Sequence, residues 1–133
     1  MQHAQLYSLI QRLYMGLPNG SEDILDNSVS FRDPVVIVKG RVAVLAMFQK
    51  INRMFPHTHI EQLQQREEQD GASRWYLTVQ YGTRASGKTR AFRTELNIEY
   101  TFDGRITRIT EHWLWPIKMR GNGQNRLLRT NDD

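Results

Sequence analysis

Ser28-Val29-Ser30-Phe31-Arg32-Asp33-Pro34-Val35 is the stretch of sequence that decides the fold. Successive side chains of an extended chain point to opposite faces, so Val29, Phe31 and Asp33 share the face that should meet the core. Pro34 has no N–H to donate and therefore ends the strand. The stretch predicts a strand that carries a carboxylate to the mouth of an apolar interior. Such a carboxylate is either a proton-transfer group or a structural cap for the turn at Pro34.

Helical periodicity flanks this strand on both sides. One helix is predicted from residue 6 to residue 17, with apolar positions at Leu6, Leu9, Ile10, Leu13 and Leu17. Another ends before Pro56 and has apolar positions at Val44, Leu45, Phe48, Ile51 and Phe55. Between the first helix and the strand, Ser21 is a good N-cap for a short helix that contains Ile24 and Leu25.

The second half of the chain alternates apolar and polar residues, which is typical of strands. Residues 57–68 are only weakly β-like, whereas two later segments are clear: Trp75, Leu77, Val79 and Tyr81, then Thr94, Leu96, Ile98, Tyr100 and Phe102. Asp103-Gly104 predicts a hairpin turn. The last strand places Ile109, Glu111, Trp113 and Trp115 on one face, and Arg108, Thr110 and His112 on the other. This order predicts an α+β domain, with three helices packed on one face of a curved antiparallel sheet.

Length and composition bound the class of protein. The 133 residues suit one domain, which we place at 1–116, followed by a basic polar tail at 117–133. No apolar run is long enough for a membrane span, and the N-terminus lacks the basic region of a signal peptide. The absence of cysteine excludes disulfides and thiolate chemistry and fits a cytoplasmic protein.

The net charge of +4 comes from 14 arginines and 4 lysines against 14 acidic residues. These arginines are spread along the chain, which favours a solvated, ion-paired surface over a nucleic-acid footprint. A modest basic group in the tail keeps nucleic-acid binding as the weakest alternative: Lys118, Arg120, Arg126 and Arg129.

Several short motifs together resemble the nuclear-transport-factor-2-like superfamily, and within it the SnoaL-like and ketosteroid-isomerase-like branch. They are the amphipathic first helix, the strand that ends in Arg-Asp-Pro-Val, the helix that ends near Phe-Pro, and the closing Gly-Arg-Ile…Glu-His-Trp. The resemblance covers residues 6–115. It implies a cone-shaped fold, in which a bent sheet wraps around the helices and leaves an apolar pocket at its open end.

The resemblance also implies roles for particular residues. Asp33 falls where ketosteroid isomerases keep their carboxylate base, and Glu111 falls where SnoaL-like cyclases often place an acid. The isomerases' second essential acid falls at Ile98. Their first-helix tyrosine falls near Leu13, so Tyr14 is one position, or about a quarter-turn, away. These departures count against steroid isomerisation, because a base without an oxyanion stabiliser lacks a large electrostatic contribution.

Asp33 and Glu111 are the candidate catalytic pair. If both face the cavity, apolar walls and mutual repulsion should make one of them hold a proton, which would supply an acid and a base together. The alternative is structural, with Asp33 capping the turn and Glu111 pairing with an arginine such as Arg90.

A flat hydrophobic ligand is the expected partner of the pocket. Its predicted walls are Tyr14, Phe31, Trp75, Leu96, Ile98, Tyr100 and Trp113. Core packing is the competing interpretation for the aromatic members of this set.

Two other patterns suggest ligands, and we favour neither. His57 and His59 could share one face of a strand, but no third ligand follows at a telling spacing, so we expect no metal and no cofactor. Residues 82–89 match the phosphate-binding pattern GxxxxGKT. That loop needs a helix after it, whereas the alternation that follows predicts a strand and hence a hairpin. On the last strand, we expect His112 to point outward, toward Glu99 or a dimer interface.

The sequence therefore favours a small hydrophobic ligand-binding protein. Its expected chemistry is isomerase-, cyclase- or dehydratase-like proton transfer, with Asp33 as the base and Glu111 as the partner acid. The alternative is a non-catalytic binding or interaction module of the same fold. In either case we expect a homodimer packed through the outer face of the sheet.

Overall fold

A computed structural model describes residues 1–16, 20–83 and 89–116, with the side chains of 115 and 116 left out. In chain order the elements are α1 (His3–Tyr14), β1 (Leu25–Arg32), β2 (Ile37–Lys39), α2 (Arg41–Met54), β3 (His59–Gln69), β4 (Ala72–Gly82), β5 (Thr89–Tyr100) and β6 (Ile106–Pro116). The expected tail lies outside the described residues. Within the described part of the chain, no helix is both long and apolar enough to cross a membrane.

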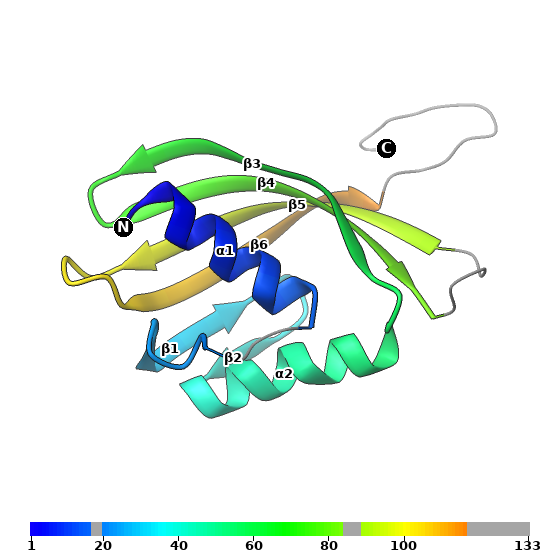
Figure 1. Ribbon diagram of the computed structural model, residues 1–133, viewed down its shortest axis with the longest axis horizontal. Helices are drawn as coiled ribbons and strands as arrows, with labels where there is room; N and C mark the ends of the chain where they lie inside the picture. Colours follow the sequence, from blue (N-terminus) through cyan, green and yellow to red (C-terminus); the bar gives the residue numbers. More distant parts are fainter. Residues whose placement is uncertain (17–19, 84–88, 117–133) are drawn as a thin grey trace.

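One six-stranded sheet, in the order β2-β1-β6-β5-β4-β3, forms the wall of the molecule. It curves around α1, and α2 lies beside β1 and β2 (Figure 1). This arrangement confirms the predicted α+β cone. The sheet is mixed rather than wholly antiparallel, because β1 runs parallel to β6, while all other neighbours are antiparallel.

The short helix expected after Ser21 is absent from the described residues. The backbone there makes a single turn, in which the Ser21 carbonyl accepts hydrogen bonds from the N–H groups of Ile24 and Leu25. Leu25 already belongs to β1 and pairs with Ile106, while Ile106 N–H donates to the Ile24 carbonyl at 2.7 Å. Ile24 and Leu25, which would have continued the helix, are therefore hydrogen-bonded to β6 instead. The Ser21 hydroxyl is buried and caps nothing among the described residues.

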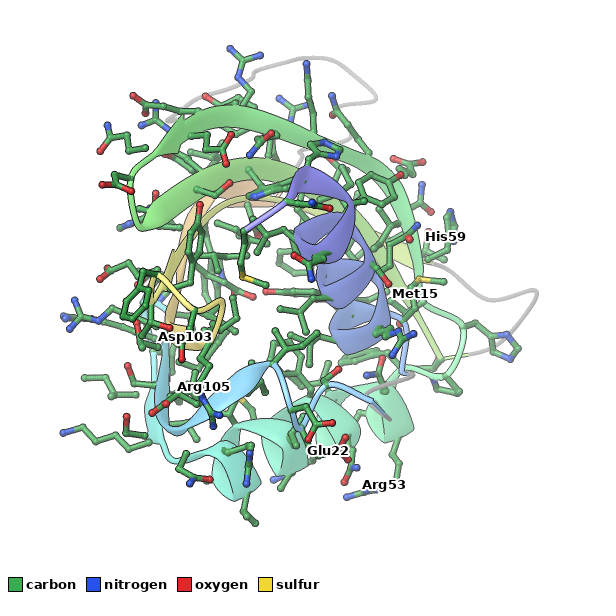
Figure 2. All side chains as sticks on the ribbon, turned by 60° about the vertical axis from the view of Figure 1, so that its left-hand side comes forward. Met15, Glu22, Arg53, His59, Asp103 and Arg105 are labelled. Atoms are coloured by element: carbon green, nitrogen blue, oxygen red, sulfur yellow. The ribbon has the colours of Figure 1, made fainter. Side chains whose placement is uncertain are left out.

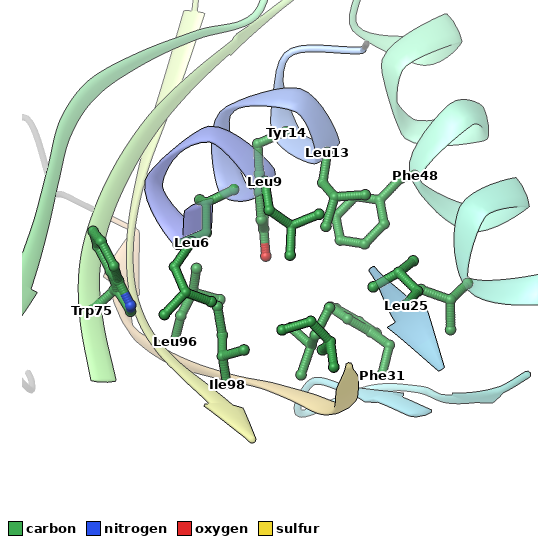
Figure 3. Close-up of a cluster of buried hydrophobic side chains, with 14 of the residues drawn as sticks. Leu6, Leu9, Leu13, Tyr14, Leu25, Phe31, Phe48, Trp75, Leu96 and Ile98 are labelled. Atoms are coloured by element: carbon green, nitrogen blue, oxygen red, sulfur yellow. The ribbon is translucent and has the colours of Figure 1, made fainter. Parts of the chain in front are cut away.

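Apolar faces predicted for the helices and strands meet in one core (Figure 3). The α1 stripe is fully buried from Leu6 to Leu13, as are Val44 and Phe48 of α2 and the inward residues of the sheet. The helix ends at Tyr14 rather than at the predicted residue 17, and Leu17 lies outside the described residues. Polar side chains such as Glu22, Arg53 and Asp103 point outward (Figure 2). The buried β1 face holds Val29 and Phe31, as the alternation predicted.

The β4–β5 and β5–β6 connections are hairpins. Gly82 lies opposite Thr89 in an antiparallel ladder, and the described chain continues from Thr89 as β5. A strand rather than a helix therefore comes after the phosphate-loop pattern, of which residues 84–88 lie outside the described residues. Gly104 has a φ of 85°, which glycine adopts without strain, and closes the turn predicted at Asp103-Gly104. Phe102 belongs to that turn and is fully exposed, because β5 ends two residues earlier.

The edge strand β3 was the hardest strand to predict. Most of its side chains are exposed, and glutamine and glutamate dominate its sequence. Charged and polar residues on an edge strand hinder pairing with another chain. The same composition hides the strand from a search for apolar alternation.

Candidate functional site

A cavity of about 390 Å³ opens at the end of the cone where α1 and α2 finish and β4, β5 and β6 meet. Its inner wall is fully buried and apolar, with Leu13, Phe31 and Phe48 as members. Its outer part includes the exposed residues Thr83 and Arg90. A volume of this size lies in the range of small-molecule sites.

Glu111 is one of the two acids in the cavity wall. It lies on β6, which brings its carboxylate beneath the end of α1. The Tyr14 hydroxyl donates to Glu111 Oε2, and the Trp113 indole N–H donates to Oε1 at 2.9 Å. Figure 3 shows the Tyr14 hydroxyl directed into the interior. Each carboxylate oxygen thus has one protein donor.

The apolar surroundings change the acid–base properties of this group. Burial raises the pKa of Glu111 above its ordinary value, and the charge of Asp33 adds to the increase. The hydrogen bonds from Tyr14 and Trp113 act in the opposite direction but do not cancel it. Burial and the nearby Glu111 charge also raise the pKa of Tyr14, so its phenol keeps its proton and remains a donor.

Asp33 also lines the cavity, at the turn between β1 and β2. Its Oδ1 accepts the backbone N–H groups of Val35 and Val36, both at 2.8 Å. The two interpretations of this residue are therefore compatible, since one side chain caps the Pro34 turn and contributes negative charge to the pocket.

The aromatic residues form two sides of the cavity. Phe48 contacts both Tyr14 and Phe31 edge to face, with ring centroids 5.1 and 5.6 Å apart. Tyr81 does the same with Phe55 and Phe92, at 5.5 and 5.6 Å. These contacts fix the walls without filling the space between them.

Solved structures with this arrangement are numerous. A candidate isomerase of the SnoaL-like family from Agrobacterium tumefaciens matches with a TM-score of 0.67 and 13% identity, over 84% of this chain and 97% of that one. An NTF2-like protein from Anabaena variabilis matches with a TM-score of 0.70 and 16% identity, over 83% and 84%. One from Cytophaga hutchinsonii gives 0.62 and 15%, over 86% and 100%.

This chain has the nuclear-transport-factor-2-like fold. The sequence itself matches no protein-family model and no curated protein. At these identities the similarity establishes the fold alone.

Within this nuclear-transport-factor-2-like fold, five of the residues predicted for the site line one cavity: Tyr14, Phe31, Asp33, Glu111 and Trp113. Tyr14 lines the pocket, as predicted for a wall residue, although it lies about a quarter-turn from the tyrosine position that the resemblance implies at Leu13. Leu13 and Tyr14 both reach the pocket at the end of α1. Glu111 makes no ion pair with Arg90; its partners are Tyr14 and Trp113.

Four predicted wall residues lie elsewhere in the interior and do not line this cavity: Trp75, Leu96, Ile98 and Tyr100. All four face inward, as predicted, but further along their strands. Trp75 packs beneath His3 and Tyr7 at the other end of α1, with its ring centroid 5.0 and 6.2 Å from theirs. The alternation of apolar and polar residues shows which face of a strand points inward. Whether an inward residue belongs to the core or to the pocket depends on its position along the strand.

Several lining residues were missed or assigned another role. The sequence assigned the α2 stripe no place in the site, yet Ile51 and Phe55 line the cavity, because α2 ends beside its opening. Phe92 and Thr94 belong to the inward face of β5, nearer the open end than Leu96. A rule that selects inward residues near the Gly82–Thr89 hairpin would have found them.

The histidines lie apart from this site. His112 is exposed on the outer face and lies opposite Glu95 rather than Glu99, which pairs with Arg108 at 3.6 Å. Among the described residues no group of three or more histidine, aspartate and glutamate side chains could hold a metal ion.

Proposed function

We propose that this protein binds a small hydrophobic molecule in the cavity and that Glu111 exchanges a proton with it. The observation that carries the proposal is a carboxylate with a raised pKa in the wall of an open apolar cavity. A pocket filled by its own side chains would instead have favoured an interaction module. Carboxylates with a raised pKa in a cleft are typical of proton-transfer sites.

Glu111, rather than Asp33 as the sequence suggested, acts as the base in the simplest step. Burial raises the pKa of Glu111, and the nearby charge of Asp33 adds to the increase. A C–H bond next to a substrate carbonyl breaks, its proton goes to Glu111, and the electron pair moves to the carbonyl oxygen. Protonated Glu111 no longer needs the Tyr14 hydrogen bond, so that hydroxyl can donate to the new oxyanion. In a substrate with a β,γ double bond, return of the proton to the γ-carbon moves that double bond into conjugation with the carbonyl and completes an isomerisation.

Deuterium exchange tests this step without knowledge of the natural substrate. The probe is 2-tetralone, a bicyclic ketone with acidic α-hydrogens, followed by NMR in D₂O. Wild type should accelerate exchange, and Glu111→Gln should lose most of the acceleration, about a hundredfold for a general base. The matched control is Glu99→Gln on the outer face, which should behave as wild type. Equal rates for wild type and Glu111→Gln would contradict a catalytic role.

A binding protein without catalysis is the second candidate. It is favoured by Ile98, which is buried in the core at the position where the resemblance implies a second acid. Both candidate functions use the same pocket, and one measurement distinguishes them. If 2-tetralone raises Tm but its exchange rate is unaffected by the protein, the site binds and does not catalyse.

A further inference from the structure

The polar groups of the cavity differ in how far the protein itself satisfies them. Glu111 receives one donor on each oxygen, and Asp33 Oδ1 receives two backbone N–H groups. Asn52 donates its amide to the carbonyls of Leu13 and Phe48, at 3.2 and 2.9 Å, and so ties α1 to α2. The acids and this amide already have protein partners.

Arg90 is different. It is the only basic residue among the described residues that line the cavity, and it lies one residue into β5, beside the opening. No hydrogen bond or ion pair joins its guanidinium to another described residue. The arginine therefore offers up to five N–H donors to whatever occupies the mouth.

The surface next to Arg90 is aromatic. Tyr81 is its partner in the β4–β5 ladder, and the Tyr81 ring packs against Phe55 and Phe92. A ligand that reaches Arg90 from inside the cavity would pass along these rings. The donor at the mouth and the apolar wall behind it are parts of one surface.

We propose that the ligand is an amphiphilic organic acid, whose carboxylate pairs with Arg90 while its ring or chain occupies the cavity. This inference rests on the proposed function, since it names the ligand class of the same pocket. Arginine matches a carboxylate with two parallel hydrogen bonds. At an exposed mouth the anion keeps part of its hydration, so the desolvation cost that opposes buried pairs is small.

The opposite charge would be a poorer match. A cationic ligand at the mouth would be repelled by Arg90, and its ammonium would compete with Tyr14 and Trp113 for Glu111. A neutral ligand would leave the arginine donors to water. Among the charged side chains that line the described part of the cavity, Arg90 is the one without a described protein partner, and an anionic acceptor complements it.

Three compounds with one ring system test the charge of the ligand: 2-naphthylacetate, 2-naphthylacetamide and 2-(2-naphthyl)ethylamine. Each is titrated calorimetrically into the full chain, as wild type, Arg90→Gln and Arg93→Gln. Arg93 is the matched control, because it is an exposed arginine on the same strand that does not line the cavity. Arg90→Lys adds a variant that keeps the positive charge but cannot donate two parallel hydrogen bonds to a carboxylate.

Wild type should bind the carboxylate about tenfold more tightly than the amide, as expected for one charge-assisted pair. Arg90→Gln should abolish that preference and leave amide binding unchanged, while Arg93→Gln should keep it. Arg90→Lys should keep part of it. Equal affinities for acid and amide, or a preference for the amine, would overturn the ligand class but leave the pocket intact. If none of the three binds, the ligand class and the proposed function fail together.

Discussion

Glu111 is the single residue on which the chemistry of the site depends, and its environment also makes it a source of instability. Its two donors hold the carboxylate in place, while the apolar wall and Asp33 oppose its charge. A group in this position should leave a signature in the pH dependence of folding.

We expect Glu111→Gln to stabilise the protein at pH 8 and to change it little near pH 4. Because the pKa of Glu111 is raised in the folded state, folding favours the protonated carboxyl. That contribution is complete below the unfolded pKa, about 4.3, and is lost as the pH rises through the folded pKa. Glutamine stays neutral throughout, so its advantage at high pH should reach about 1 kcal/mol, or roughly 4 °C in Tm.

Thermal unfolding of both proteins from pH 4 to pH 9 measures this difference. Glu99→Gln, at a half-exposed site where the carboxylate pairs with Arg108, should gain no stability at high pH. A wild type that becomes more stable relative to Glu111→Gln as the pH rises would mean that the pKa of Glu111 is lowered instead.

At the scale of elements, the turn between β1 and β2 joins structure to the site. Asp33 holds two backbone amides of this turn and faces the cavity at the same time. Changes at this position should therefore affect the turn and the electrostatics of the pocket separately.

Asp33→Ala should cost about 1–2 kcal/mol, because the amides of Val35 and Val36 lose their acceptor. Asp33→Asn keeps an acceptor and should cost less than half as much. Both variants remove the charge that raises the pKa of Glu111, so in both that pKa should fall toward its ordinary value. Urea unfolding measures the first effect, and ¹³C NMR titration of the Glu111 carboxyl measures the second. Equal stability losses would show that Asp33 does not cap the turn.

The helices and strands that could be predicted from the sequence are those that bury one face, because the apolar residues of that face recur at regular spacing. Leu6, Leu9 and Leu13 place α1, and Trp75, Leu77 and Val79 place β4, because burial of one face enforces the spacing. The turn at Ser21 could not be predicted, because pairing of Leu25 with Ile106, distant in the chain, overrides local capping. β3 was obscured by its polar edge composition.

The site could likewise be predicted only in part. Asp33 and Glu111 were recognised from the strand pattern and the resemblance, but the contact between Tyr14 and Glu111 spans 97 positions of the chain. Such a contact depends on where α1 ends relative to the curve of the sheet. Depth along the cone, which separates Phe92 from Leu96 on one face of β5, is likewise a property of the assembled sheet.

At the scale of the whole molecule, a homodimer packed through the outer face of the sheet stays a prediction. This face carries the exposed Leu114 and partly covered side chains such as Tyr76 and Thr110. Light scattering after size exclusion should give about twice the 15.7 kDa mass of one chain. Leu114→Asp, which places a charge in the contact, should shift the mass toward the monomer. A monomeric wild type at high concentration would contradict the dimer.

The open cavity should also lower the stability of the whole fold, because its walls lack packing partners on one side. Ile51 lines the cavity from α2, one turn after Phe48. We expect Ile51→Phe to place a ring in this space, to raise stability by about 1 kcal/mol, and to weaken binding of 2-naphthylacetamide at least tenfold. Thermal unfolding and calorimetry measure the two effects.

Val42→Phe is the matched control, because Val42 lies on the same helix with 82% of its surface exposed. It should change neither stability nor affinity. If Ile51→Phe binds the amide as tightly as wild type, the ligand does not occupy this cavity. Higher stability together with lost binding would mean that the open pocket costs the fold stability, because a single substitution that fills it makes the protein more stable.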